Sequence, residues 1–356
     1  MTSAMRVPVA AALLALGSSA CSRASDPHVA APAAIRVFVS NETAGTVAIV
    51  DPTTGVVEHV VAVGKRPRGL KLSRDGRQLF VALSGSPIAP PGVDESTLPP
   101  PDRAADGIGV VDLATRTLVR TYPSGQDPES FDLSLDGKTL YVSNEETAEM
   151  SVLDLETGTI VARVPVGEEP EGVTLRPDGR MVYVTCESDH AVVAVDTSSR
   201  AVVARVITAK RPRSIAFTSD SKTMFVPGEI EHAVSVVDVA THTVASTIVL
   251  AGSIASAGPP RPMGVVLSPN GRELFVSNGR GRSVSVIDVA TRQVTRTFAD
   301  VGERPWGIGI SPDGHTVYTA NGPSGDLSVI DATTGRVTRR IPLGGSPWGV
   351  VVWPQR

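Results

Sequence analysis

The chain has 356 residues and a formal net charge of −4. So small an acidic excess excludes a general electrostatic attraction to nucleic acid or anionic lipid. Beyond the N-terminus, no apolar run approaches the ~20 residues that a membrane-spanning helix requires. The 33 glycines and 28 prolines, together with abundant Val and Thr, instead indicate a turn-rich, all-β protein.

The N-terminus has the organisation of a secretory signal. Arg6 precedes a short apolar run and a group of small residues, so we predict that residues 1–20 are a signal peptide. Cys21 follows directly, as in a bacterial lipoprotein signal, and the pattern is compatible either with lipidation of Cys21 or with ordinary cleavage after Ala20. Residues 21–34 form a predicted flexible tether. The expected location is periplasmic or secreted, with a membrane anchor in the lipidated case.

The rest of the chain is a sevenfold repeat. Each copy contains a short apolar segment followed by a second one that ends on aspartate. The first segments are residues 37–41, 79–83, 140–144, 182–186, 224–228, 274–278 and 317–321, and the second end at Asp51, Asp112, Asp154, Asp196, Asp238, Asp288 and Asp331. The commonest spacing, 42 residues, fits one four-stranded blade of a β-propeller. We therefore predict a single all-β domain at residues 35–356, a seven-bladed β-propeller of four-stranded antiparallel blades.

The two ends of this domain predict how the ring closes. No innermost strand precedes residues 37–41, whereas residues 346–354 have the pattern of an innermost strand with no partner behind it. The C-terminal strand should complete the N-terminal blade and so remove free sheet edges. The seven repeated aspartates begin turns, and we predict that they accept local backbone hydrogen bonds and have no catalytic role. Cys186 is a predicted lone thiol, so stability must come from packing.

The segments LYVSN, VYVTC and VSVID, with their SPDG turns, resemble the YVTN family of bacterial β-propeller repeats over residues 35–353. The connectors RPRG, EPEG and RPRS and the closing PWGVVV more specifically resemble a secreted seven-repeat propeller family associated with pyrroloquinoline-quinone-dependent alcohol catabolism and export genes. That resemblance implies an accessory role in alcohol oxidation or export. We expect no cofactor in this chain, because the tryptophan of the quinone-docking motif and any C-x-x-C-H haem site are missing.

Two insertions mark one face of the predicted ring. The distance from Leu83 to Asp112 is twenty-nine positions, whereas the equivalent distance is ten in the other six blades. The excess forms a Pro-rich loop at about residues 84–107, and eight extra residues precede the sixth blade. In a propeller both places lie on the same face, and insertions gather where binding surfaces usually are.

On that face each connector carries a proline flanked by residues whose charge changes from blade to blade. We predict that these residues ring the channel mouth and bind a ligand or partner: Arg66, Arg68, Asp127, Glu129, Glu169, Glu171, Arg211, Arg213, Arg261, Arg304, Trp306 and Trp348. Trp306 and Trp348 are a candidate aromatic platform. A second interpretation, compatible with the first, is a structural belt of ion pairs that joins Arg68 to Glu129 and Arg213 to Glu171.

The loops beside this ring are acidic and contain two histidines. Their members are Glu145, Glu146, Glu187, Asp189, His190, Glu229, Glu231 and His232. Such residues could hold Ca²⁺ or a transition metal, or form a solvated patch. Since the residues come from separate blades and their convergence is not visible in the sequence, we favour the patch and predict no metal site.

The leading hypothesis is a non-enzymatic binding or scaffold propeller whose variable face holds a periplasmic protein or a small ligand, with no nucleic acid involved. The alternative is a lactonase-like hydrolase or lyase that uses Glu129, Glu171 and His190 at the channel mouth. The two hypotheses differ in one geometric respect. Catalytic acids should stand unpaired in a pocket, whereas acids of a binding ring should be matched to arginines.

Overall fold

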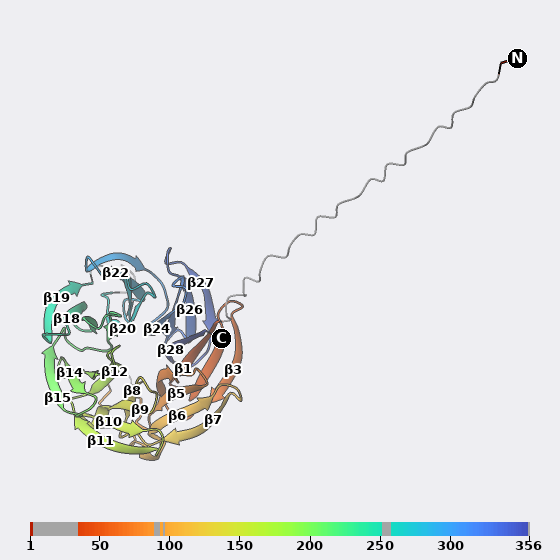
Figure 1. Ribbon diagram of the computed structural model, residues 1–356. Coiled ribbons are helices and arrows are strands. Elements are labelled where there is room, and N and C mark those ends of the chain that lie inside the picture. Colours follow the sequence, from red (N-terminus) through yellow and green to blue (C-terminus); the bar gives the residue numbers. More distant parts are fainter. Residues whose placement is uncertain (3–34, 89–92, 95–96, 251–257, 355–356) are drawn as a thin grey trace. The chain divides into compact units, whose positions relative to one another are not determined.

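The computed structural model describes residues 1–2, 35–88, 93–94, 97–250 and 258–354. Residues 34–356 form one compact unit, in which seven four-stranded sheets follow one another around a ring (Figure 1). The predicted seven-bladed β-propeller is therefore confirmed. Residues 3–20 of the predicted signal peptide and all of the predicted tether, including Cys21, lie outside the described residues.

Each blade has strands A to D from the axis outwards. Strands A are β28 (Pro347–Pro354), β4 (Pro67–Leu72), β8 (Pro128–Leu133), β12 (Pro170–Leu175), β16 (Ala216–Phe217), β20 (Pro262–Leu267) and β24 (Pro305–Ile310) for blades 1 to 7. Strands B, in the same order, are β1 (Ile35–Asn41), β5 (Gln78–Leu83), β9 (Thr139–Asn144), β13 (Met181–Cys186), β17 (Thr223–Gly228), β21 (Glu273–Asn278) and β25 (Thr316–Asn321).

The outer half of each blade follows the same order. Strands C are β2 (Thr46–Asp51), β6 (Gly107–Asp112), β10 (Glu149–Asp154), β14 (Ala191–Asp196), β18 (Ala233–Asp238), β22 (Ser283–Asp288) and β26 (Asp326–Asp331). Strands D are β3 (Val56–Ala62), β7 (Thr117–Tyr122), β11 (Thr159–Pro165), β15 (Val202–Ile207), β19 (Thr243–Val249), β23 (Gln293–Phe298) and β27 (Val337–Pro342). Every strand C ends on the repeated aspartate, as predicted.

The C-terminal strand closes the ring. β28 pairs antiparallel with β1, from Ile35 opposite Pro354 to Asn41 opposite Pro347. The Asn41 side chain accepts a hydrogen bond from the Ser346 N–H at 2.9 Å and donates one to the Gly344 carbonyl at 2.8 Å. Blade 1 is thus assembled from both ends of the domain, and β1 is paired on both sides, with β28 and with β2.

Strands B and C are apolar because they are covered on both faces. The side chains of adjacent blades pack against each other, as Val37 and Val39 of blade 1 do against Tyr318 and Leu327 of blade 7. Burying one such valine or leucine contributes about 1.5–3 kcal/mol, and a cluster of this kind fills each interval between blades. The core is therefore a ring of inter-blade layers around the axis.

The A–B and C–D turns lie on the face opposite the connectors and are uniform. In each C–D turn the repeated aspartate accepts backbone hydrogen bonds; Asp331, for example, accepts them from Thr333 and Thr334 at 3.1 and 2.7 Å. Such bonds hold the pKa of Asp196 at about 2, with the Ser199 N–H as the largest cause. The predicted structural role of these aspartates is confirmed by this geometry.

Blade 5 departs from the pattern. The sequence predicts a full innermost strand after Pro212, but β16 contains only two residues, and Pro212 makes an isolated bridge to Gly228. Its neighbour β17 carries Pro227, which has no N–H to donate to the ladder. Pro227 therefore interrupts the pairing between the innermost strand and β17, in the stretch between the Pro212 bridge and β16, where Arg213 lies.

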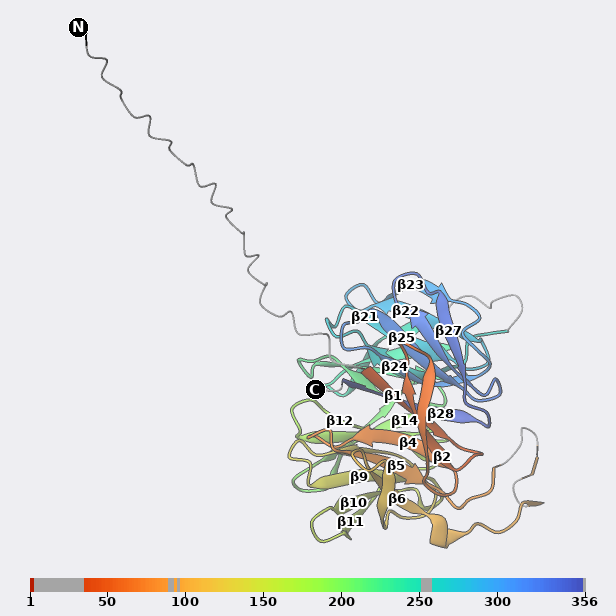
Figure 2. The same ribbon diagram turned by 90° about the vertical axis from the view of Figure 1, so that its right-hand side faces the viewer.

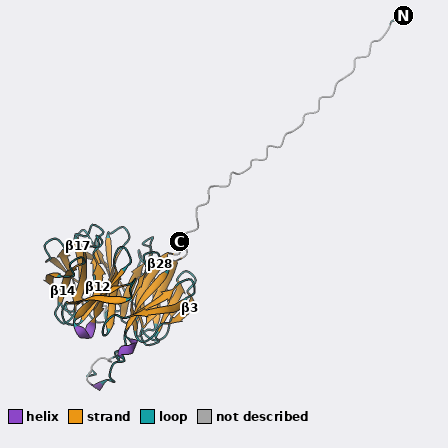
Figure 3. Cartoon of the chain, turned by 60° about the horizontal axis from the view of Figure 1, so that its bottom comes forward, coloured by secondary structure: helices purple, strands orange, loops and turns teal. Residues whose placement is uncertain are grey.

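The variable face carries both insertions. The blade 2 loop follows β5, and the residues after β19 lead to β20, so the described flanks of both leave the ring on the side of the B–C loops (Figure 2). Short 3₁₀ turns lie on loops at Arg103–Ala105 and Glu145–Thr147 (Figure 3). Within the described residues, no helix is long and apolar enough to cross a membrane.

Candidate ligand-binding mouth of the ring

A cavity of about 820 Å³ lies at the mouth of the axial channel on the variable face. Eleven of the twelve predicted ring residues line it; Arg261 does not. A second cavity of about 210 Å³ continues along the inner strands and shares Glu129, Glu171 and Arg213 with the first, as well as both tryptophans. The residues beside the connector prolines thus meet at one site, which we call the mouth.

The backbone holds the residue before the proline in an unusual conformation. Five of these residues have positive φ, between 40° and 63°: Arg66, Asp127, Glu169, Arg211 and Arg304. A non-glycine residue in this region costs on the order of 1 kcal/mol. Since the surrounding connector repeats in five blades, the conformation comes from the architecture, and it aims each side chain at the mouth.

Adjacent blades hold the residue after the proline through its carbonyl group. The Ser40 hydroxyl donates to the Arg68 carbonyl at 2.7 Å, and Ser277 donates to that of Trp306 at 2.8 Å. The following position is usually glycine, because an added Cβ would approach the next blade's carbonyl; at Gly307 it would lie 2.5 Å from the Trp348 oxygen. These contacts fix the ring residues relative to one another.

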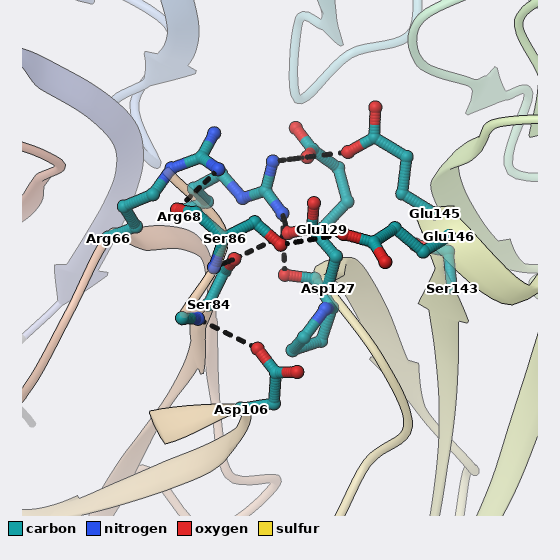
Figure 4. Close-up of polar contacts among 12 residues, drawn as sticks. Arg66, Arg68, Ser84, Ser86, Asp106, Asp127, Glu129, Ser143, Glu145 and Glu146 are labelled. Carbon is teal, nitrogen blue, oxygen red and sulfur yellow. Dashed lines mark hydrogen bonds and ion pairs between the residues drawn. The ribbon is translucent and has the colours of Figure 1, made fainter. Parts of the chain in front are cut away.

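Arg68 neutralises three carboxylates on blade 3. Its guanidinium forms ion pairs with Asp127 and Glu129 and lies 3.4 Å from Glu145 (Figure 4). It also donates to the Pro128 carbonyl at 3.1 Å. Arg68 is only 3% exposed, so its charge is available to these carboxylates and is largely withheld from solvent.

Arg213 has the equivalent role beside blade 4. Its guanidinium pairs with Glu171, lies 2.5 Å from Glu187, and bonds to Glu229 at 2.7 and 3.0 Å. Arg211 also pairs with Glu187. The two predicted pairings, Arg68 with Glu129 and Arg213 with Glu171, are present, but each arginine serves three carboxylates.

Three carboxylates for one buried cation leave some of the acids poorly neutralised. Burial raises the pKa of Glu129 to about 8 and that of Glu187 to about 7, although Arg68 and Arg211 respectively oppose the shift. Burial also raises the pKa of Glu145. Burial disfavours ionised Asp127 as well, but Arg68 and the Ser84 hydroxyl outweigh it and lower that pKa. Part of the negative charge is therefore offset by bound protons.

Trp306 and Trp348 form the predicted platform on the other side of the mouth. Their rings stack with centroids 5.6 Å apart and planes inclined by 22°. The guanidinium carbons of Arg304 and Arg213 lie 4.8 and 5.3 Å from the Trp306 centroid, within the range of a cation–π interaction. Burial lowers the pKa of Arg304.

The blade 2 insertion supplies one wall. Arg66 donates to the Ser86 and Pro87 carbonyls at 3.0 and 3.3 Å and pairs with Glu42 at 3.0 Å. Arg103, from the 3₁₀ turn of the insertion, pairs with Glu146 on blade 3. The insertion is therefore bonded to Arg66, at the start of blade 2, and to blade 3, and Arg66 in turn pairs with Glu42 of blade 1. The insertion residues that line the mouth are Pro87, Ile88, Leu98, Pro99, Pro100 and Pro101.

The acidic B–C loop residues do not gather into a metal site. Glu145, Glu187 and Glu229 are bound to arginines, and Asp189 pairs with Arg205. The Nδ1 atom of His190 lies 2.9 Å from the Glu187 carbonyl oxygen. Among the residues that the structure describes, no group of three or more His, Cys, Asp or Glu side chains is arranged to hold a metal ion.

Sequence reasoning missed part of the lining. Glu42 and Glu168 face the mouth, and Glu145, Glu146 and Glu187 belong to it although they were assigned to a separate patch. Glu42 and Glu145 directly follow the last residue of a strand B, Asn41 and Asn144, and this position was a usable signal.

Fold and site together define a seven-bladed β-propeller with a preformed polar cavity at one end of its channel. Residues 94–180 and 175–355 match the model of the YncE-like β-propeller family, and the chain belongs to that family. No curated protein matches the chain significantly.

Solved structures with the same fold are distant in sequence. A functionally unknown protein from Desulfotomaculum acetoxidans is 12% identical, with a TM-score of 0.72 over 89% of this chain and 98% of that one. A putative 6-phosphogluconolactonase from Bacteroides fragilis is 17% identical, with a TM-score of 0.70 over 92% and 100%. The hydrazine synthase of Kuenenia stuttgartiensis is 19% identical, with a TM-score of 0.65 over 80% and 88%. At such identities the likeness concerns the fold.

Proposed function

We propose that this protein is a non-enzymatic binding propeller that holds a small ligand, or a segment of a partner protein, in the mouth. The observation that supports this proposal most is the pairing of the buried acids. Glu129 and Glu171 are each bonded to an arginine, which is the arrangement expected for a rigid binding ring. A closed ring also presents its charges with little ordering cost on binding.

The sequence supports a setting for the proposed function. The signal-like N-terminus supports a periplasmic or secreted location, with Cys21 as a candidate lipid anchor. The resemblance of the connectors to secreted propellers associated with quinone-dependent catabolism supports a role in periplasmic alcohol oxidation or export.

Hydrolysis is the second candidate. Structures named as putative 6-phosphogluconolactonases share the fold, and a buried acid with the raised pKa of Glu129 is suited to proton transfer near neutral pH. However, the carboxylate of Glu129 is bound by Arg68, and His190 does not line the mouth. We therefore rank hydrolysis below binding.

One experiment separates the two candidates. The wild-type protein and an Arg304→Gln/Trp348→Leu variant are incubated with periplasmic extract, and co-purifying molecules are identified by mass spectrometry. We expect a species that the wild type retains and the mouth variant loses, whereas Arg336→Gln on the opposite face retains it. In parallel, 6-phosphogluconolactone and simple lactones are assayed. Lactone turnover that disappears in Glu129→Gln would overturn the binding proposal.

A further inference from the structure

We propose that the mouth binds a short peptide with free ends, whose carboxylate is held by Arg304 and whose ammonium group is held by Glu168 and Glu169. This inference rests on the proposed binding function and adds the chemical class of the ligand. It follows from the charges that remain after the internal ion pairs of the mouth have been accounted for.

Arg304 is the cation left over. Among the described residues, no carboxylate lies within 4.0 Å of its guanidinium, which faces the ring of Trp306. The other four arginines that line the mouth, Arg66, Arg68, Arg211 and Arg213, are all in ion pairs. A half-buried guanidinium without an anion is a site for one, since a carboxylate matches its donor geometry.

Glu168 and Glu169 are the anions left over. Both line the mouth, and within the described part of the chain neither is paired with a cation; Glu169 accepts a hydrogen bond from the Ser188 hydroxyl. They lie on the connector into blade 4, whereas Arg304 lies on the connector into blade 7. In a ring of seven, blades 3 and 4 face blade 7, and Figure 1 shows β12 and β24 on opposite sides of the ring. The unpaired charges of opposite sign therefore lie on connectors on opposite sides of the mouth.

The balance of positive and negative side chains in the mouth favours a ligand that carries one charge of each sign. Among described residues, nine carboxylates and five guanidinium groups line the cavity. Even with Glu129 and Glu187 protonated, seven of these carboxylates remain against the five guanidinium groups. A simple anion would therefore meet an excess of like charge, and a simple cation would leave Arg304 unneutralised. A single amino acid carries both charges, but they are too close together to reach opposite sides of the ring. A short peptide separates them.

The remaining surfaces suit the middle of a peptide. Trp348 is half-buried and lines the cavity, and Ile88, Leu98 and the insertion prolines add apolar area. The cavity volume of about 820 Å³ is within the range of small-ligand sites. An apolar side chain between the two charged ends can stack on the Trp348 ring.

The test uses the tripeptide Ala-Phe-Ala, its N-acetylated form and its C-amidated form. Tryptophan emission reports binding, because the chain has three tryptophans and two are at the mouth. The third, Trp353, packs on Phe38 with ring centroids 5.8 Å apart, so Trp353→Phe should leave the response unchanged. We expect each cap to weaken binding about tenfold or more, since a hydrogen bond to a charged group is lost.

Variants of the protein test which side chains bind each end of the peptide. In Arg304→Gln the C-terminal cap should no longer matter, and in the Glu168→Gln/Glu169→Gln double variant the N-terminal cap should no longer matter. Arg304→Lys should restore part of the affinity. The matched controls on the opposite face, Arg336→Gln and Glu156→Gln, should behave as wild type.

Three results would overturn the inference. The first is the absence of any emission change with the three tripeptides up to about 10 mM, a concentration at which even a weak site would be occupied. The second is equal affinity for the free and the capped peptides, and the third is a loss of affinity in Arg336→Gln equal to that in Arg304→Gln. Each leaves the proposed binding function to its own test, because another ligand retained from extract by the wild type and lost by the mouth variant would still support it.

Discussion

Arg68 and Arg213 make the mouth dependent on two buried cations. Each is surrounded by three carboxylates, and their side chains are 4% and 7% exposed. Removing one partner of a buried ion pair leaves uncompensated charge in a poorly solvated place. Most of the predicted ring residues therefore contribute to stability as well as to recognition, whereas Arg304, which has no anionic partner among the described residues, is free for recognition.

This difference predicts contrasting effects on stability. Arg213→Met should lower the free energy of unfolding by about 3–5 kcal/mol, because Glu171, Glu187 and Glu229 lose their shared cation. Arg304→Gln should change it by less than about 1 kcal/mol. Urea unfolding followed by circular dichroism measures both. An Arg213→Met variant with the free energy of unfolding of the wild type would show that these acids are neutralised in another way.

The raised pKa of Glu129 predicts that the stability of the protein depends on pH. Its pKa is about 8 in the folded protein, against an ordinary value of 4.5. Between these values the folded state holds a proton that the unfolded state has released, so the free energy of unfolding should fall as pH rises from about 5 to about 8. Glu187, with a pKa of about 7, adds a slope of the same sign.

Glu129→Gln mimics the protonated acid, so its stability should decline less over that pH interval. The measurement is urea unfolding at several pH values, with the exposed Glu156→Gln as the control. A variant slope equal to that of the wild type would contradict the role assigned to Glu129.

Among the structural elements, the innermost strands have the closest contacts with the adjacent blades. In blades 2, 4, 6, 7 and 1, a Cβ added to the glycine after the ring residue would lie 2.5–2.9 Å from the next blade's carbonyl oxygen. Blades 3 and 5 have Ser130 and Ser214 there. In blade 5, the Ser214 hydroxyl donates to the Met263 carbonyl at 2.6 Å. This bond replaces the one that a strand B serine donates to the next blade elsewhere, as Ser40 and Ser277 do, because blade 5 has Pro227 at that position.

We expect Gly307→Ala to destabilise the protein by about 1–3 kcal/mol, because the Trp348 backbone must move away from the new methyl group. Ser130→Ala, at the equivalent position of blade 3, already has its Cβ accommodated and should change stability by less than about 0.5 kcal/mol. Thermal unfolding compares the two. Equal effects would show that the close approach at Gly307 is unimportant.

At the scale of the whole molecule, the ring depends on β28. Deleting residues 346–356 should abolish cooperative unfolding, because blade 1 loses its innermost strand and two blade interfaces open. Circular dichroism during heating tests this. A synthetic peptide of residues 345–356 added to the truncated chain should restore part of the transition. Unchanged thermal stability after truncation would contradict the closure described here.

How far the sequence predicts this protein also depends on scale. The repeat places all seven strands B within two residues of their observed bounds, because burial between blades demands the same apolar segment in each copy. It also places eleven ring residues at the mouth. It does not show that Arg68 reaches Glu145 as well as Glu129, or that no described carboxylate pairs with Arg304, since these contacts depend on side-chain directions across blades. The short β16 results from Pro227, a local effect that the repeat conceals.

The pairing of Ile35 with Pro354 has a consequence for chain order. Both ends of the domain meet in one sheet, on the face away from the mouth, so a short linker could join them and new termini could be opened in any C–D turn. Such a circular permutant, for example one that begins at Thr333, should fold and retain the ligand affinity of the parent chain. The mouth is defined by which blades are neighbours, and it does not depend on where in the ring the polypeptide starts.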